Sequence, residues 1–178
     1  MPIIGISNPI AAVYDGHFNA GAPVDGTDEV QTITFGSGIT GGTFKLAFDG
    51  FTTAAITWSA TNNTLRDNVD AALEALPSID TGGVVTAVGT MTAGVGTLTV
   101  TFSGANLAKK AVPLITVANN SLTGTTHVVS VAETTPGVDA TARDAPKGAT
   151  LTDTTNGILY INTGAAQAPT WTKVGTQT

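Results

Sequence analysis

The chain carries, at residues 42–50, the stretch Gly-Thr-Phe-Lys-Leu-Ala-Phe-Asp-Gly. Phe44, Leu46 and Phe48 occupy every second position, and the residues between them are polar or small. Successive side chains of a β-strand point to opposite faces, so this alternation predicts a strand with one buried face. The stretch therefore indicates a sheet protein whose core lies on one side of the sheet.

The same alternation recurs at Thr97–Phe102, where Leu98, Val100 and Phe102 face one way and three threonines face the other. Weaker versions occur at Val30–Phe35, Ala54–Trp58, Val84–Val88, Leu114–Val117 and His127–Val131. Short strands at such close spacing are typical of two antiparallel sheets packed face to face. We therefore expect an all-β fold, an immunoglobulin-like (Ig-like) antiparallel β-sandwich.

One stretch, residues 64–76, has helical spacing instead. Its apolar residues fall at i, i+4, i+7, i+8 and i+11, along one stripe: Leu65, Val69, Ala72, Leu73 and Leu76. Asn62 or Asn63 is expected to cap the start, and Pro77 cannot continue the helix. A helix of about three turns is not stable alone, so we expect it to lie against an edge or one end of the sandwich.

Composition divides the chain into three segments. Residues 1–29 contain Pro2, Pro9 and Pro23, and their isoleucines follow no period. These isoleucines are Ile3, Ile4, Ile6 and Ile10. We interpret 1–29 as an extended N-terminal arm, 30–137 as the β-sandwich body, and 138–178 as a linker followed by a C-terminal β-hairpin appendage.

The hairpin prediction rests on Asn156-Gly157, which lies between two β-type runs and favours a type I′ turn. Residues 169–174 are expected to add a third strand. The large apolar residues of this segment are few: Leu159, Tyr160, Ile161 and Trp171. Because a hairpin unit of this size is marginal alone, we expect the body or another subunit to cover these four residues.

Charge and composition exclude several classes of protein. The chain has 7 Lys plus Arg against 13 Asp plus Glu, a net charge of -6, and no Cys. Nucleic-acid binding needs basic clusters that are absent here, and without Cys there are no disulfides or thiolate metal sites. No apolar run approaches the roughly 20 residues of a membrane span, and the N-terminus is a poor signal peptide. We expect no nucleic-acid or membrane partner.

Candidate catalytic and metal-binding residues are sparse. His17 and His127 lie in different segments without a second His at i+3 or i+4. A triad of Ser130, His127 and an Asp lacks the Gly-x-Ser-x-Gly elbow that would expose the serine. A glycosidase would need two facing carboxylates, for which there is no signature. We expect no enzyme activity, no cofactor and no metal.

Two groups of carboxylates are interpreted as ordinary surface residues. The cluster Asp25, Asp28 and Glu29 lacks the spaced ligand ladder of a calcium loop, so a solvated turn is favoured over a bound cation. On the helix, Asp70 and Glu74 repel at i,i+4, and Arg66 compensates toward Asp70. We expect this side of the helix to be a solvated face.

Two stretches resemble known virion modules. Residues 31–137, with Gln-Thr-Ile-Thr-Phe, Gly-Gly-Thr-Phe-Lys-Leu-Ala-Phe-Asp-Gly, Ala-Leu-Glu-Ala-Leu-Pro, Gly-Thr-Leu-Thr-Val-Thr-Phe-Ser-Gly and Val-Ala-Glu-Thr-Thr-Pro-Gly, resemble a β-sandwich module of bacteriophage virion proteins and bacterial surface proteins. The tail, Pro-Lys-Gly-Ala-Thr-Leu-Thr-Asp-Thr-Thr-Asn-Gly-Ile-Leu-Tyr-Ile-Asn-Thr-Gly and Ala-Pro-Thr-Trp-Thr-Lys-Val, is similar to a motif of tailed-phage head fibres, capsid decoration proteins and tail fibres.

The resemblance implies a non-catalytic structural protein on the outer capsid surface of a phage virion. The expected partners are the major capsid protein, contacted by Ile3, Ile4, Ile6 and Ile10, and further copies of the chain in a homo-oligomer, with a trimer favoured because shells have many local three-fold positions. An alternative is an adhesive or receptor-binding module of a tail fibre or bacterial surface protein, in which Tyr160 or Trp171 stacks on a glycan.

Overall fold

The structure is a computed structural model that describes residues 22–79, 81–104 and 106–176. The chain divides into two compact units. We call Asp28–Val138 the body, and we call the described residues 22–27 and 139–176 the hairpin unit. The hairpin unit is therefore discontinuous in sequence, and the whole body is inserted between its two parts.

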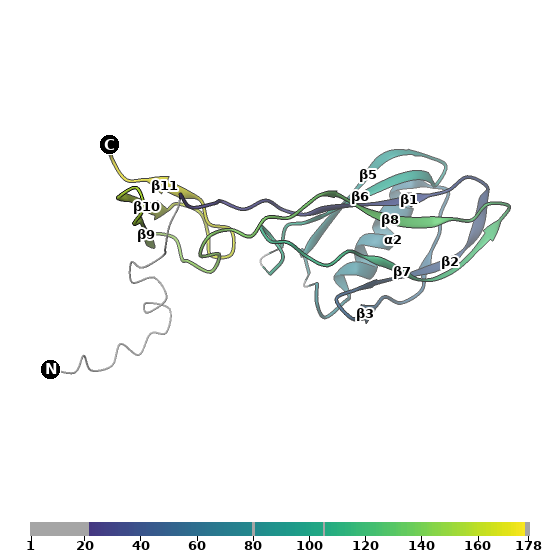
Figure 1. The fold of residues 1–178 in the computed structure, drawn as a ribbon. Coiled ribbons are helices and arrows are strands. Elements are labelled where there is room, and N and C mark those ends of the chain that lie inside the picture. The colour runs from purple at the N-terminus through teal and green to yellow at the C-terminus, as the bar shows by residue number, and fades with distance from the viewer. Residues whose placement is uncertain (1–21, 80, 105, 177–178) are drawn as a thin grey trace. The chain divides into compact units, whose positions relative to one another are not determined.

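The first sheet of the body contains four antiparallel strands in the order β5-β6-β1-β8 (Figure 1). They span Val84–Thr92 (β5), Val95–Phe102 (β6), Val30–Phe35 (β1) and Val129–Thr135 (β8). The register places Ile33 opposite Leu98 and Val131, so apolar residues of neighbouring strands share one face. The other face of β1 and β6 carries threonines at alternate positions, as the period of two predicts.

The second sheet is built around β2, Ile39–Phe48. Along one edge of β2 lie the two short strands β3 (Phe51–Thr52) and β4 (Ile56–Thr57), and along the other lies β7 (Thr116–Gly124). All pairings are antiparallel. Within the described residues, the prediction of an all-β sandwich with one short helix is confirmed.

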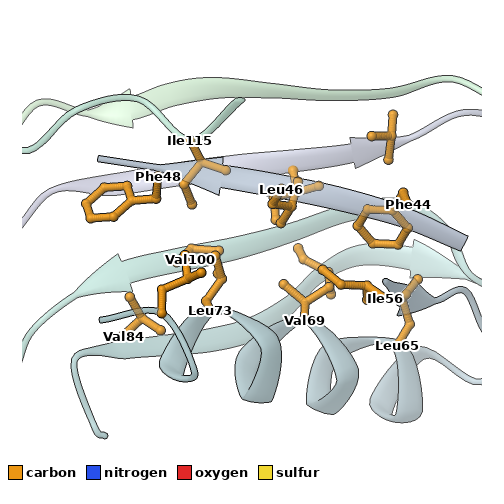
Figure 2. Close-up of a cluster of buried hydrophobic side chains, with 14 of the residues drawn as sticks. Phe44, Leu46, Phe48, Ile56, Leu65, Val69, Leu73, Val84, Val100 and Ile115 are labelled. Carbon is orange, nitrogen blue, oxygen red and sulfur yellow. The ribbon is translucent and has the colours of Figure 1, made fainter. Parts of the chain in front are cut away.

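The core lies between the two sheets and helix α2, Asn62–Glu74. In Figure 2, Leu65, Val69 and Leu73 point from the helix toward the apolar side of β2. Aromatic rings join the sheets. Phe48 of β2 stacks on Phe102 of β6 at 5.1 Å between ring centroids, and Phe35 meets Phe44 edge to face at 5.3 Å. The residues first used to predict the strands and the helix are thus the residues of the core.

Helix α2 begins earlier than predicted, and its cap differs. The N-cap residue is Thr61, whose side chain makes no capping hydrogen bond. The Asn62 side chain instead accepts from the N–H of Gly94 at 2.9 Å and donates to the carbonyl of Met91 at 3.0 Å. Asn62 therefore fastens the helix start to the β5–β6 turn. Among the described residues, no helix is long and apolar enough to cross a membrane.

Four of the weaker strand predictions differ from the structure in their boundaries. The run Val84–Val88 is only the first part of β5, which continues to Thr92. The run Ala54–Trp58 contains only the two-residue β4, because the Thr53 hydroxyl accepts the N–H of Leu46 where a longer strand would pair. Only the last two residues of the run Leu114–Val117 belong to β7, which begins at Thr116 and continues to Gly124. The strand predicted at His127–Val131 begins at Val129.

The hairpin unit holds a three-stranded antiparallel sheet in the order β11-β10-β9. The strands are Thr150–Asp153 (β9), Ile158–Asn162 (β10) and Trp171–Lys173 (β11). The predicted hairpin is present, but its turn is not type I′. Asp153 pairs with Ile158, so the loop has four residues, and Gly157 (φ 67°) has positive φ whereas Asn156 does not.

Candidate functional site

The hairpin unit contains Tyr160 and Trp171, the aromatic residues that the sequence predicts to contact a partner or a glycan. Trp171 is only 7% exposed, and it packs with Leu151 and Ala145 in a small core of its own. Its indole Nε1 donates to the carbonyl of Thr141 at 2.9 Å. We expected Trp171 to need cover from the body or another subunit. The structure differs, because the linker residues 139–149 fold back and supply that cover.

Residues 22–27 also belong to this unit rather than to a separate arm. The Asp25 Oδ1 accepts the main-chain N–H of Trp171 at 2.8 Å. Val24 donates its N–H to the Thr141 hydroxyl at 3.0 Å, and Thr141 donates its own N–H to the Val24 carbonyl at 2.9 Å. The predicted arm, 1–29, therefore overlaps the hairpin unit over 22–27 and the body from Asp28. Ile3, Ile4, Ile6 and Ile10 lie outside the described residues.

Asn162 organises the linker and the β10–β11 connection. It is 1% exposed, and its Nδ2 donates to the carbonyls of Ala145 (2.8 Å) and Pro146 (3.3 Å). Its Oδ1 accepts the N–H groups of Gly164 and Thr170, both at 2.9 Å. All four hydrogen-bonding positions of the side-chain amide are thus used. Asn162 was not singled out from the sequence. The sequence signal for its burial is that it follows Ile158 and Tyr160 at every second position of β10 and so lies on the same face of the strand.

Asp153 performs the same task for the turn. It is fully buried, and its Oδ1 accepts the N–H groups of Thr155 (3.0 Å) and Asn156 (3.1 Å). Its Oδ2 accepts a hydrogen bond from the Asn156 side chain at 2.7 Å. The carboxylate therefore replaces the backbone bonds that a two-residue turn would make.

The two faces of the sheet separate the four residues predicted to contact a partner. Residues directly opposite each other in the register share a face. Tyr160 pairs with Leu151, so it shares the face of the small core with Trp171. Leu159 and Ile161 project from the second face, where both are half-buried. Contact of these residues with a partner remains a prediction.

The acidic cluster in 25–29 is divided between the two units. Asp25 serves the hairpin unit, whereas Asp28 Oδ1 accepts the N–H of Lys109 at 2.7 Å within the body. Glu29 is 2% exposed and accepts the N–H of Val112 at 2.9 Å. Each carboxylate thus binds backbone. They do not form the solvated turn that we expected.

Gln31 extends this network and is fully buried. Its Oε1 accepts the N–H of Ile115 at 2.8 Å, and its Nε2 donates to the carbonyl of Pro113 at 2.9 Å and to Glu29. Together Glu29 and Gln31 hold residues 112–115, which lead into β7, against the start of β1. A glutamine in phase with Ile33 and Phe35 on a predicted strand was the sequence signal for this network.

The carboxylates of the helix also bind backbone rather than forming a purely solvated face. Asp70 Oδ1 accepts the N–H of Thr86 on β5 at 3.0 Å, and Glu74 Oε1 accepts the N–H of Gly82 at 2.7 Å. Arg66 pairs with Asp67 at 2.5 Å rather than compensating Asp70. The helix therefore shields the edge of β5, where a strand would otherwise offer unpaired backbone.

No metal-binding arrangement is apparent in the described part of the chain. His127 is exposed, with its Nδ1 3.3 Å from the carbonyl oxygen of Gly124. His17 lies outside the described residues. Within 22–79, 81–104 and 106–176, no three His, Cys, Asp or Glu side chains are grouped so that they could hold a metal ion. The polar side chains described above make contacts that maintain the fold.

Comparison with known proteins finds structural similarity to a phage chain. No protein family matches the sequence, and no curated protein matches it. Among solved structures, the chain is similar to a chain from Mycobacterium phage Patience, with 18% sequence identity and a TM-score of 0.41. The match covers 84% of this chain and 47% of the phage chain. The present chain thus spans about half the length of that phage chain.

Proposed function

We propose that this protein is a structural component of a bacteriophage virion and decorates the outside of the capsid. The observation that carries the proposal is the joint resemblance of residues 31–137 and of the tail to modules of phage virion proteins. The buried polar side chains agree with such a role. Glu29, Gln31, Asp153 and Asn162 all bind backbone, as expected of a rigid display protein rather than of a reactive site.

In this proposal the N-terminal segment attaches the protein to the major capsid protein. Its four isoleucines, Ile3, Ile4, Ile6 and Ile10, bury apolar surface against the shell, and each buried side chain contributes about 1.5–3 kcal/mol. Contacts repeated over many copies give avidity without tight individual binding. A trimer fits the local three-fold positions of a shell.

Truncation tests the attachment, and the structure sets where the chain should be cut. A chain beginning at Ala22 keeps Asp25 and its bond to Trp171, whereas a chain beginning at Val30 loses both that bond and Glu29. We expect the first truncation to remain folded but no longer to co-sediment with undecorated capsids. The matched control replaces Ile3, Ile4, Ile6 and Ile10 by Ser at full length. Full binding by both variants would refute attachment through this segment.

Glycan binding, the alternative, is less well supported by the geometry. Stacking on a sugar needs an accessible aromatic face, but Trp171 is 7% exposed and Tyr160 packs beside the same small core. We therefore expect no saturable binding on a glycan array. Binding that disappears in Tyr160→Ala would favour the adhesive function instead.

A further inference from the structure

We infer that the second face of the sheet β9-β10-β11 docks onto the same face of another copy of this chain. This face is defined by Leu159, Ile161 and Val174, surrounded by Thr150, Thr152, Thr163, Thr170 and Thr172. The inference deepens the proposed function, because it specifies which residues join the copies on a particle.

Strand register places these residues together. The N–H of Val174 donates to the carbonyl of Leu159 at 2.9 Å, which continues the β10–β11 ladder and sets the two side chains opposite each other. The hydroxyls of Thr163 and Thr172 lie 3.0 Å apart on the same side of the sheet. Val174 is 38% exposed, and Leu159 and Ile161 are half-buried. A continuous aliphatic row with a threonine border results.

The first face of the sheet is already occupied by the chain itself. Its small core consists of Leu151 and Trp171 with Ala145, and Ala142, Ala149 and Tyr160 pack against them. None of the residues of the second face belongs to this core. Of the two faces of the sheet, the second is therefore the one that this core leaves uncovered.

Charge favours a second copy as that partner. The charged residues of the three strands are Asp153 and Lys173, and the register assigns both to the first face. The second face is therefore neutral in a chain whose net charge is -6. Two copies that approach through it bring no carboxylates together, and a basic or acidic partner would find nothing there to pair with.

The size of the face also favours a neighbour that is already close. A stable interface removes about 800 Å² from each partner, more than three partly buried aliphatic residues can supply. Association through this face in dilute solution should therefore be weak. It becomes significant when copies are concentrated, as they would be on a shell.

Site-directed cross-linking tests the inference, because the chain has no Cys of its own. Thr172→Cys places a thiol on the second face, and Lys173→Cys places one on the opposite face, one residue away and also at an exposed position. We expect a short bismaleimide to join copies of the full-length Thr172→Cys protein, increasingly with concentration, and at least fivefold more than Lys173→Cys. Adding Val174→Lys to Thr172→Cys should remove most of that product.

Equal cross-linking of the two cysteine variants, or cross-linking unaffected by Val174→Lys, would overturn the inference. On particles, a Thr172→Cys product with a capsid protein instead of a second copy would also overturn it, yet it would leave the virion role intact. Conversely, the protein could cross-link specifically through the second face and yet be absent from purified virions. That result would refute the proposed function but would still support docking through the second face.

Discussion

The Oδ1 of Asp25 accepts the main-chain N–H of Trp171, 146 positions away in the sequence, at 2.8 Å. This bond joins the two parts of the hairpin unit, which are separated by the entire body. The small unit is therefore completed only when both ends of the described chain meet. Its stability should depend on residues that precede the sandwich as well as on the hairpin itself.

Replacing Asp25 by Ala should weaken the hairpin unit specifically. The substitution leaves the N–H of Trp171 without its acceptor, and a lost hydrogen bond of this kind costs about 1 kcal/mol. In a Trp58→Phe background, Trp171 fluorescence reports this unit alone, so its urea midpoint should fall. Asp144→Ala, at an exposed carboxylate, is the control and should leave the midpoint unchanged. Equal urea midpoints for Asp25→Ala and Asp144→Ala would contradict a stabilising role of the bond between Asp25 and Trp171.

Asn162→Asp should be more damaging than its size suggests. The carboxylate keeps the acceptor for Gly164 and Thr170 but removes the donors to the carbonyls of Ala145 and Pro146. Leaving buried carbonyls without a donor costs about 1–3 kcal/mol each, and a buried charge adds to it. Hydrogen exchange should show loss of protection across 145–171 while β1 and β6 stay protected. Retained protection in 145–171 would show that the amide is dispensable.

Gln31→Leu should release the segment that leads into β7. The substitution keeps the volume of the side chain but leaves the N–H of Ile115 and the carbonyl of Pro113 without partners, at about 1–3 kcal/mol for each group. Trypsin should then cut faster after Lys109 or Lys110. Thr34→Val, an exposed change on the same strand, should not alter the cleavage rate. Unchanged cleavage in Gln31→Leu would mean that other contacts hold the segment.

A change in the body should affect the hairpin unit, because the body is the segment that connects the two parts of that unit. Phe102→Ala removes the ring that stacks on Phe48 and should destabilise the body by about 3–5 kcal/mol. Once the body unfolds, Asp28–Val138 becomes a flexible loop between the two parts of the hairpin unit. Bringing these two parts together then costs about 4 kcal/mol in loop-closure entropy. The thermal midpoint of Trp171 fluorescence, again with Trp58→Phe, should therefore fall. Phe102→Leu should lower this midpoint less. A midpoint that is unchanged in both variants would show that the stability of the hairpin unit does not depend on the body.

Local patterns were sufficient to predict most of the body. The alternation at Phe44, Leu46 and Phe48 and the helical stripe through Leu65, Val69 and Leu73 are consequences of burial on one side, and all six residues are in the core. Boundaries were less accurate, because side chains such as Thr53 and Asn62 replace backbone bonds at the ends of elements.

The organisation of the hairpin unit could not be predicted in the same way. Its defining contacts join Asp25 to Trp171 and Asn162 to Ala145, and neither pair leaves a periodic pattern in the sequence. The strands β9, β10 and β11 alone supply too few apolar residues to cover Trp171, which is why their sequence predicts cover from outside the unit. The alanines of 142–149 contribute little apolar area each, yet together they close the first face.

The most direct test of the central claim is to locate the protein on purified virions by immunogold labelling with an antibody against the hairpin unit. The proposed function predicts gold particles distributed over the outer surface of the capsid, and none on virions lacking the protein. Labelling confined to the tail tip, or absent from virions that otherwise contain their full set of proteins, would contradict capsid decoration.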